Sequence, residues 1–270
     1  MEVINCKEIA QKIKDNVKEK AKYNSYEMIV LTNPYDEPSK AYVRNKRLAA
    51  EYCGIGFKEI PLDENTNVEE LLNISYSTVP VIVQLPMCDK LGEKQRNIAL
   101  SIMRDNMLDC DGFAPDSYVK PATATGVMKI FEEIDYDLTG KHVCIIGRGK
   151  TCARPLVDMM LEKDATVTVC HSKTQNLADV TNKCDVIVSC VGKENLITVD
   201  HVKDDTVVIN VGLTRNDAGK LVGDIDFENV KNKTSYITKN IGGVGLLTVA
   251  CLMENVVDLY DLRAEDYEDD

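Results

Sequence analysis

Three polar side chains are spaced along one expected helix in a way that could do chemistry. In the stretch PSKAYVRNKRLAAEYCGI (38–55), Ser39, Tyr42 and Lys46 stand at positions i, i+3 and i+7. At about 100° per residue these positions fall within roughly 60° of one another on the helix surface. A hydroxyl, a phenol and an amine therefore share one stripe, which is either a solvated face or part of an active site. Val43 lies beside them on the helical wheel and favours a pocket.

Further polar groups stand where expected strands end. Gln84 follows the β-branched run of VPVIVQLPM (79–87), so its amide is either hydrogen-bonded within the protein or faces a cleft. Asp109 and Asp111 lie two residues apart in LDCDGF. One of these carboxylates could accept paired hydrogen bonds from the amino and ring N–H groups of a heterocycle. An aspartate-rich turn that caps its own backbone is the alternative.

The stretch CIIGRGKTCARP (144–155) follows an expected strand and opens an expected helix. Gly147 and Gly149 form a G-x-G pattern, and Ala153 takes the third small position of a dinucleotide fingerprint. Such a turn lets backbone N–H groups at a helix N-terminus approach a pyrophosphate. The G-x-G pattern alone is a weak indication of a dinucleotide site, and its position between an expected strand and an expected helix strengthens it. An ordinary βα turn is the alternative.

The end of the next expected strand bears on which dinucleotide binds. NAD enzymes usually carry Asp or Glu there to bind the ribose 2′-hydroxyl. Here ATVTVC is followed by His171, Ser172 and Lys173, without a carboxylate. Arg148 adds a positive charge in the preceding turn. These residues favour NADP over NAD.

A second glycine-rich loop, NIGGVGLLT (240–248), leads into the last expected helix. Gly242, Gly243 and Gly245 permit close approach of the backbone to a ligand. A hinge without a ligand is the alternative.

Strand-like and helix-like segments alternate along the chain, which predicts an α/β fold of two lobes with parallel sheets. Residues 1–120 and 245–270 are expected to form the first lobe, and residues 121–244 a Rossmann-like, doubly wound dinucleotide-binding lobe. The last amphipathic helix, LLTVACLMENVVDLY, is expected to pack back on the first lobe. Ligands should bind at the carboxyl ends of the strands, in a cleft between the lobes.

Composition excludes several classes of partner. The 270 residues include 32 Lys and Arg against 44 Asp and Glu, a net charge of −12, which argues against nucleic acid and anionic membranes. The ten cysteines are scattered without a CxxC pair, so they are expected to be reduced, mostly buried thiols with no metal. No leader or membrane-spanning stretch is expected, which predicts a soluble, cytoplasmic protein.

Taken in order, these motifs resemble the bifunctional methylenetetrahydrofolate dehydrogenase/methenyltetrahydrofolate cyclohydrolase family. The resemblance covers nearly the whole chain and rests on order and spacing. It is carried by S-x-x-Y-V-x-x-K (39–46), VQLP (83–86), D-x-DGF (109–113), GR (147–148), ATVTVCHSKT (165–174), VGDID (222–226) and GGVG (242–245).

The resemblance implies a role for each candidate residue. Lys46 would be the catalytic amine, supported by Gln84 and Tyr42. The expected folate contacts are Ser39, Tyr42, Asp111, Gly242 and Gly243, with Asp111 anchoring the pterin. The expected NADP contacts are Gly147, Arg148, Gly149, Ser172 and Leu213, the last through its backbone. Family members form dimers through their cofactor lobes, so a homodimer is expected.

The implied chemistry has two steps. Hydride leaves the one-carbon bridge of methylenetetrahydrofolate for C4 of the nicotinamide, and the folate nitrogen stabilises the resulting cation, so orientation does most of the work. Water then attacks the methenyl cation and ring opening gives 10-formyltetrahydrofolate, a step in which Lys46 would be a base or a hydrogen-bond donor.

The chain departs from the family pattern at several positions, and three alternatives stay open. Ala122 and Ala124 stand where the family usually has Cys and Pro, and Gly149 and Ala153 where it has Ser and Gly. The alternatives are a monofunctional methylenetetrahydrofolate dehydrogenase, another two-lobe NAD(P)-dependent dehydrogenase, and a non-catalytic nucleotide-binding protein.

Overall fold

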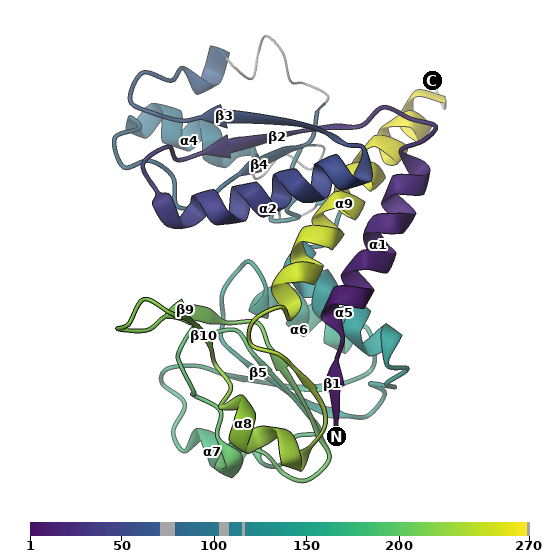
Figure 1. Ribbon diagram of the computed structural model, residues 1–270, viewed down its shortest axis with the longest axis vertical. Coiled ribbons are helices and arrows are strands. Elements are labelled where there is room, and N and C mark those ends of the chain that lie inside the picture. The colour runs from purple at the N-terminus through teal and green to yellow at the C-terminus, as the bar shows by residue number, and fades with distance from the viewer. Residues whose placement is uncertain (71–78, 103–107, 115–116, 269–270) are drawn as a thin grey trace. The chain divides into compact units, whose positions relative to one another are not determined.

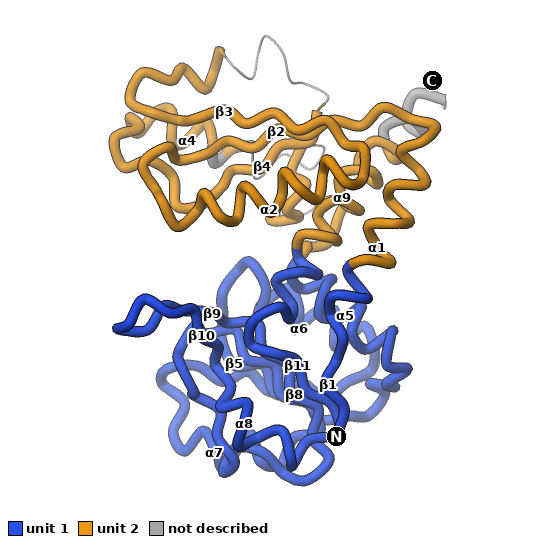
Figure 2. Tube along the Cα trace, in the orientation of Figure 1, with its two compact units in different colours: residues 1–10, 123–248 blue, residues 11–122, 249–270 orange. Residues whose placement is uncertain are grey.

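Both parts of the chain are built on parallel sheets, as the alternating pattern predicts. The computed structural model describes residues 1–70, 79–102, 108–114 and 117–268 (Figure 1). The chain forms two compact units, here called unit 1 (residues 1–10 and 123–248) and unit 2 (residues 11–122 and 249–270) (Figure 2). Within the described residues, no helix combines the length and apolar content needed to cross a membrane.

Unit 1 contains a six-stranded parallel sheet in the order β1-β11-β8-β7-β5-β6. Strand order reverses at β5, which lies between β6 and β7. Such a reversal is the topological switch point at which α/β proteins bind ligands, at the carboxyl ends of the strands. The strands are β1 (Glu2–Ile4), β5 (His142–Ile146), β6 (Thr166–Cys170), β7 (Val186–Ser189), β8 (Thr206–Asn210) and β11 (Thr234–Thr238).

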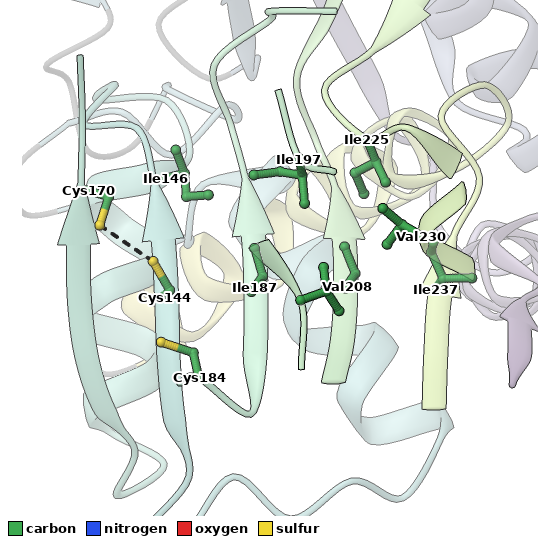
Figure 3. Packing of buried hydrophobic residues seen from close by; sticks show 11 residues of the cluster. Cys144, Ile146, Cys170, Cys184, Ile187, Ile197, Val208, Ile225, Val230 and Ile237 are labelled. Carbon is green, nitrogen blue, oxygen red and sulfur yellow. Dashed lines mark hydrogen bonds between the residues drawn. The ribbon is translucent and has the colours of Figure 1, made fainter. Parts of the chain in front are cut away.

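The central strands of this sheet are buried along their whole length, which explains their continuous apolar sequences. Cysteines serve there as small apolar side chains, as expected (Figure 3). The other elements of unit 1 are α5 (Ala122–Glu133), α6 (Ala153–Leu161), α7 (Leu177–Thr181), α8 (Phe227–Val230), the hairpin β9 (Leu213–Arg215) and β10 (Leu221–Gly223), and the 3₁₀ turns η1 (Val199–His201) and η2 (Lys231–Lys233).

Unit 2 has a three-stranded parallel sheet in the order β3-β2-β4. Its strands are β2 (Glu27–Thr32), β3 (Gly56–Pro61) and β4 (Val81–Val83), and its helices are α2 (Glu37–Cys53), α4 (Glu93–Ile102) and most of α1 (Cys6–Lys20) and α9 (Val244–Glu268). An apolar core lies around Ile29, Leu31, Val81 and Val83.

Local chemistry sets the bounds of α2, the helix with the polar stripe. Asp36 caps its N-terminus by accepting a hydrogen bond from the backbone N–H of Ser39 at 2.9 Å, and Pro38 occupies the first turn. Gly54 ends the helix in the left-handed conformation, at φ 78°, and its N–H closes the last turn. The helix therefore covers Glu37–Cys53, close to the expected stretch 38–55.

The last helix packs on unit 2, as predicted. Asn255 of α9 is buried, and its Nδ2 donates to the carbonyl oxygens of Cys110 and Lys120, each at 3.0 Å. One turn further along, Tyr260 contacts Tyr26 edge-on with ring centroids 5.4 Å apart. The Asn255 bonds fix α9 to Cys110 and Lys120, and the Tyr260 contact fixes it beside the start of β2.

The observed units differ from the expected lobes in three segments, since residues 1–10 and 245–248 belong to unit 1 and residues 121–122 to unit 2. Residues 1–10 were expected in the first lobe but belong to unit 1, because β1 pairs with β11 at the edge of the six-stranded sheet. Strand β3 was not expected, because its sequence GFKEIP is half polar. The expected helix 93–106 is present to Ile102, and its remaining residues lie outside the described part of the chain.

The role of Asn255 predicts a stability effect. Asn255→Leu would remove the donor to one buried and one partly buried carbonyl group, and each unmet group costs about 1–3 kcal/mol. We expect the free energy of unfolding to fall by about 2–4 kcal/mol, measured by urea unfolding followed by circular dichroism. Asn229→Leu is the matched control, because Asn229 is exposed and bonds only to Asp226 in the described structure. Equal effects of the two substitutions would contradict the assignment.

Candidate active site

The polar stripe on α2 contains one strongly positioned amine. Lys46 is half-buried, and its Nζ donates to Oε1 of Gln84 at 2.9 Å. Gln84 directly follows β4, where its backbone N–H donates to Leu31 at 2.8 Å and its Nε2 donates to the carbonyl of Leu85 at 3.0 Å. Both ends of the Gln84 amide are therefore bonded, which orients its carbonyl toward the amine. Tyr42, one turn before Lys46, is exposed.

Ser39 has a structural partner within its own helix. Its side chain is buried, and Oγ donates to the carbonyl of Asp36 at 2.9 Å. Capping of α2 accounts for this serine without a ligand. Its expected contact with folate stays a prediction.

The two aspartates of the 108–113 turn differ sharply. Asp109 is 2% exposed and accepts backbone hydrogen bonds from Asp111 at 3.1 Å, from Ala114 at 2.7 Å and from Phe113. Burial raises the pKa of Asp109 to about 6, and the bond from Ala114 opposes this rise. Asp109 thus forms the self-capping turn that was the alternative.

Asp111 is presented by that turn. Its carboxyl group accepts no hydrogen bond from the residues that the structure describes, and it is half-buried. Burial raises the pKa of Asp111, and the positive charge of Lys46 partly offsets the rise. Gly112, at φ 74°, is required beside it, because an added Cβ would lie 2.6 Å from the carbonyl carbon of Lys120. Lys46, Gln84 and Asp111 therefore form one electrostatically linked group in unit 2.

The glycine turn after β5 lies at the switch point of the sheet. Gly147 has φ 125°, and an added Cβ would lie 3.1 Å from the carbonyl oxygen of Cys190, which follows β7. The turn leads into α6, whose N-cap residue is Cys152. A tight turn that contains glycines and leads into a helix N-terminus fits the pyrophosphate of a dinucleotide.

The remaining predicted cofactor residues lie on the same edge of the sheet. Arg148 and Gly149 are exposed in the turn, and a Cβ at Gly149 would meet no atom within 4 Å, so a serine there would fit. Ser172 is exposed in the turn after β6. Leu213 begins β9, and its carbonyl oxygen lies 3.0 Å from where a Cβ of Gly192 would be.

A buried aspartate that sequence reasoning missed holds the turn after β7. Asp224 accepts hydrogen bonds from Oγ of Ser189 at 2.6 Å and from the backbone N–H groups of Val191 at 2.9 Å and Lys193 at 2.7 Å. Its own N–H donates to Asn210 at 2.8 Å. The stretch VGDID was noted as a motif, and an acid enclosed by apolar residues is the signal that pointed to a buried, bonded carboxylate.

Gly242 and Gly243 lie in unit 1, after β11. Gly242 has φ 75°, and a Cβ on Gly243 would lie 2.2 Å from the carbonyl oxygen of Lys239, so the turn itself requires both glycines. The folate contact expected of them stays a prediction.

The fold and these two groups of residues define an α/β enzyme with one unit for a dinucleotide and another for its substrate. Residues 4–105 match the catalytic-domain model of tetrahydrofolate dehydrogenase/cyclohydrolase, and residues 121–264 match the NAD(P)-binding-domain model. The chain therefore belongs to the tetrahydrofolate dehydrogenase/cyclohydrolase family.

Individual relatives agree over almost the full length. The bifunctional protein FolD of Ligilactobacillus salivarius is 38% identical over 95% of this chain and 96% of its own. The crystal structure of FolD from Campylobacter jejuni superposes with a TM-score of 0.88 at 36% identity, covering 97% of this chain and 99% of that one. FolD of Trypanosoma brucei, solved with NADP and an inhibitor, gives 0.86 at 28% identity, covering 97% and 98%.

The titration of Asp109 gives a pH-dependent prediction. Its folded pKa of about 6 lies above the ordinary value of 3.8, so the folded state binds the proton more tightly than the unfolded state. This group therefore adds stability as the pH falls through about 6. We expect the unfolding free energy of the wild type, relative to Asp109→Asn, to rise by about 1 kcal/mol between pH 7.5 and pH 5. A pH-independent difference in urea unfolding would contradict the buried carboxyl group.

Proposed function

We propose that the protein oxidises 5,10-methylenetetrahydrofolate to 5,10-methenyltetrahydrofolate with NADP and hydrolyses the product to 10-formyltetrahydrofolate. The observation that carries this proposal is the bond between Lys46 and Gln84 beside the carboxyl group of Asp111. The family membership and the NADP-bound relative from Trypanosoma brucei support the same chemistry.

The first step needs orientation more than acid or base. NADP, when bound, supplies a nicotinamide C4 that accepts hydride, and the nitrogen lone pair of folate stabilises the cation left behind. Asp111 would anchor the pterin by accepting hydrogen bonds from its amino and ring N–H groups. The self-capping turn of Asp109 holds Asp111 in place. A pterin anchored by Asp111 would therefore hold the methylene carbon in one position for hydride transfer.

The second step needs control of a proton. Gln84 fixes Nζ of Lys46 through a single carbonyl acceptor, which leaves the other positions of the amine for water or substrate. Lys46 would accept the proton of the attacking water or orient that water toward the methenyl carbon. Tyr42, exposed one turn earlier on the same helix, would flank the folate ring.

Cofactor recognition would fall to the turns after β5 and β6. The glycine turn at Gly147 would bind the pyrophosphate through its backbone. Arg148 and Ser172 are exposed and would supply the positive charge and the hydroxyl donor that a 2′-phosphate needs. Gly149 and the backbone of Leu213 complete the proposed cofactor contacts.

We also propose that two copies associate through unit 1 and that the protein works in the cytoplasm. Strand β6 ends the described sheet, with β5 as its neighbour, and its Val169 is 42% exposed. An edge strand with an exposed apolar side chain suits pairing with a second copy. Family resemblance carries the rest of this proposal.

A lysine substitution separates the bifunctional enzyme from a monofunctional dehydrogenase. Lys46→Met should lower hydrolysis of methenyltetrahydrofolate by about 100-fold or more, because a positioned proton-transfer group contributes about that much. Hydride transfer should survive in part, since it needs no protein base. Hydrolysis is measured without nicotinamide. Lys40→Met is the matched control, because Lys40 lies on the same helix, exposed and paired with Glu37.

No wild-type hydrolysis above background would favour the monofunctional alternative. Full retention of both activities in Lys46→Met would refute the role given to Lys46.

A charge introduced after β6 tests the cofactor. Ser172→Asp would repel a 2′-phosphate and could bind a 2′-hydroxyl instead. We expect kcat/KM with NADP to fall at least about tenfold, the scale of one lost charge-assisted contact, while kcat/KM with NAD holds or rises. Oxidation of methylenetetrahydrofolate is followed spectroscopically with both cofactors in parallel. Equal losses with both would mean that Ser172 lies away from the 2′ position.

A further inference from the structure

Two thiols meet at the proposed cofactor turn. Cys152 is the N-cap residue of α6, at the end of the glycine turn, and Cys190 follows β7 across the switch point. Their sulfur atoms are 3.8 Å apart, and both thiols are free. Neither residue has a role in the chemistry proposed above.

One thiol of this pair is accessible to small oxidants. All ten cysteines lie within the described residues, and Cys190 alone among them is not buried. A Cβ on Gly147 would lie 3.3 Å from the Cβ of Cys190, so Cys190 lies against the glycine turn. An oxidant that reaches the dinucleotide site therefore reaches Cys190.

A second close pair in the same unit lacks these properties. The sulfur atoms of Cys144 and Cys170 are 3.7 Å apart, but both residues are buried (Figure 3). They lie on β5 and β6, where the register pairs Cys144 with Thr168 and Cys170 with Ile146. Two residues of offset between neighbouring strands separate the Cα atoms by about 8 Å, beyond the span of a disulfide. The Cys144–Cys170 pair therefore serves as a control for the loss of a cysteine that is not expected to form a disulfide.

The two thiols of this pair differ in exposure, which gives them different roles. Cys190 is partly exposed and meets a small oxidant first, whereas Cys152 is buried. The sulfur of Cys152 lies 3.8 Å from that of Cys190, close enough to attack it once it is oxidised. Cys190 is therefore the thiol that reacts with the oxidant, and Cys152 is the resolving thiol.

We propose that peroxide converts Cys152 and Cys190 into a reversible disulfide, which weakens NADP binding at the glycine turn. The effect on NADP rests on the proposed function. The sulfur of Cys190 attacks one peroxide oxygen, giving a sulfenic acid and water. Cys152 then attacks that sulfur and a second water leaves. Two thiols and one peroxide thus yield one disulfide and two waters, and a dithiol reductant reverses the change by becoming a disulfide itself.

The disulfide would act on the cofactor site through the backbone. A bond between the sulfurs would tie the N-terminus of α6, at the end of the glycine turn, to the turn after β7. Asp224 holds the turn after β7 by two backbone N–H groups, so the crosslink would hold the glycine turn against a fixed partner. The pyrophosphate would then lose its approach to the bare backbone.

The test uses the full chain, reduced or treated with hydrogen peroxide. Peptide mapping by mass spectrometry should find a Cys152–Cys190 crosslink, and calorimetric titration should show NADP affinity at least tenfold lower, restored by dithiothreitol. Cys190→Ser should abolish the peroxide effect, whereas Cys170→Ser should keep it. Each variant is compared with its own reduced form, which separates oxidation from the substitution itself.

Each experimental result bears on a different part of the proposal. Absence of the crosslink, or a peroxide effect that persists in Cys190→Ser, would overturn the thiol pair. A crosslink with unchanged NADP affinity would overturn its control of the cofactor. Failure of the reduced protein to bind NADP would instead overturn the proposed cofactor, and the crosslink itself would still decide whether the pair is oxidised.

Discussion

Buried carboxylates that accept backbone N–H groups organise the functional loops of both units. A loop at the end of a buried strand leaves several N–H groups without partners, and each would cost free energy if left unpaired. Asp109 meets three of them in unit 2, and Asp224 meets two in unit 1 together with a serine hydroxyl. The same interaction therefore shapes the turn that presents Asp111 and the turn that faces Gly147.

Short-range chemistry made much of this structure predictable. The cap at Asp36, the stop at Gly54 and the spacing of Tyr42 and Lys46 all lie within one helix, so α2 followed from its own sequence. The glycine turn after β5 was predictable for the same reason, because a strand, Gly147 and a helix are contiguous. Gln84 was expected near a strand end, and its partner proved to be the lysine of the stripe.

Long-range partners account for what the sequence did not reveal. Strand β1 has three residues, and its neighbour β11 lies more than two hundred residues away, so no local pattern placed residues 1–10 in unit 1. The contacts of Asp224 reach back to Ser189, and those of Asn255 reach back to Cys110. The sequence also did not show which of Asp109 and Asp111 caps the turn. The backbone N–H groups of residues 113–114 reach the carboxylate of Asp109 only in the folded turn.

The chain passes between the units within α1, at the start of α5 and within α9, so neither unit is a continuous stretch of polypeptide. During synthesis, β11 cannot pair with β1 until residues 234–238 have emerged from the ribosome. Unit 2 must wait longer, because Asn255 and Tyr260 belong to α9. Such distant pairing delays folding. A growing chain therefore carries both units unfinished until α9 has been made.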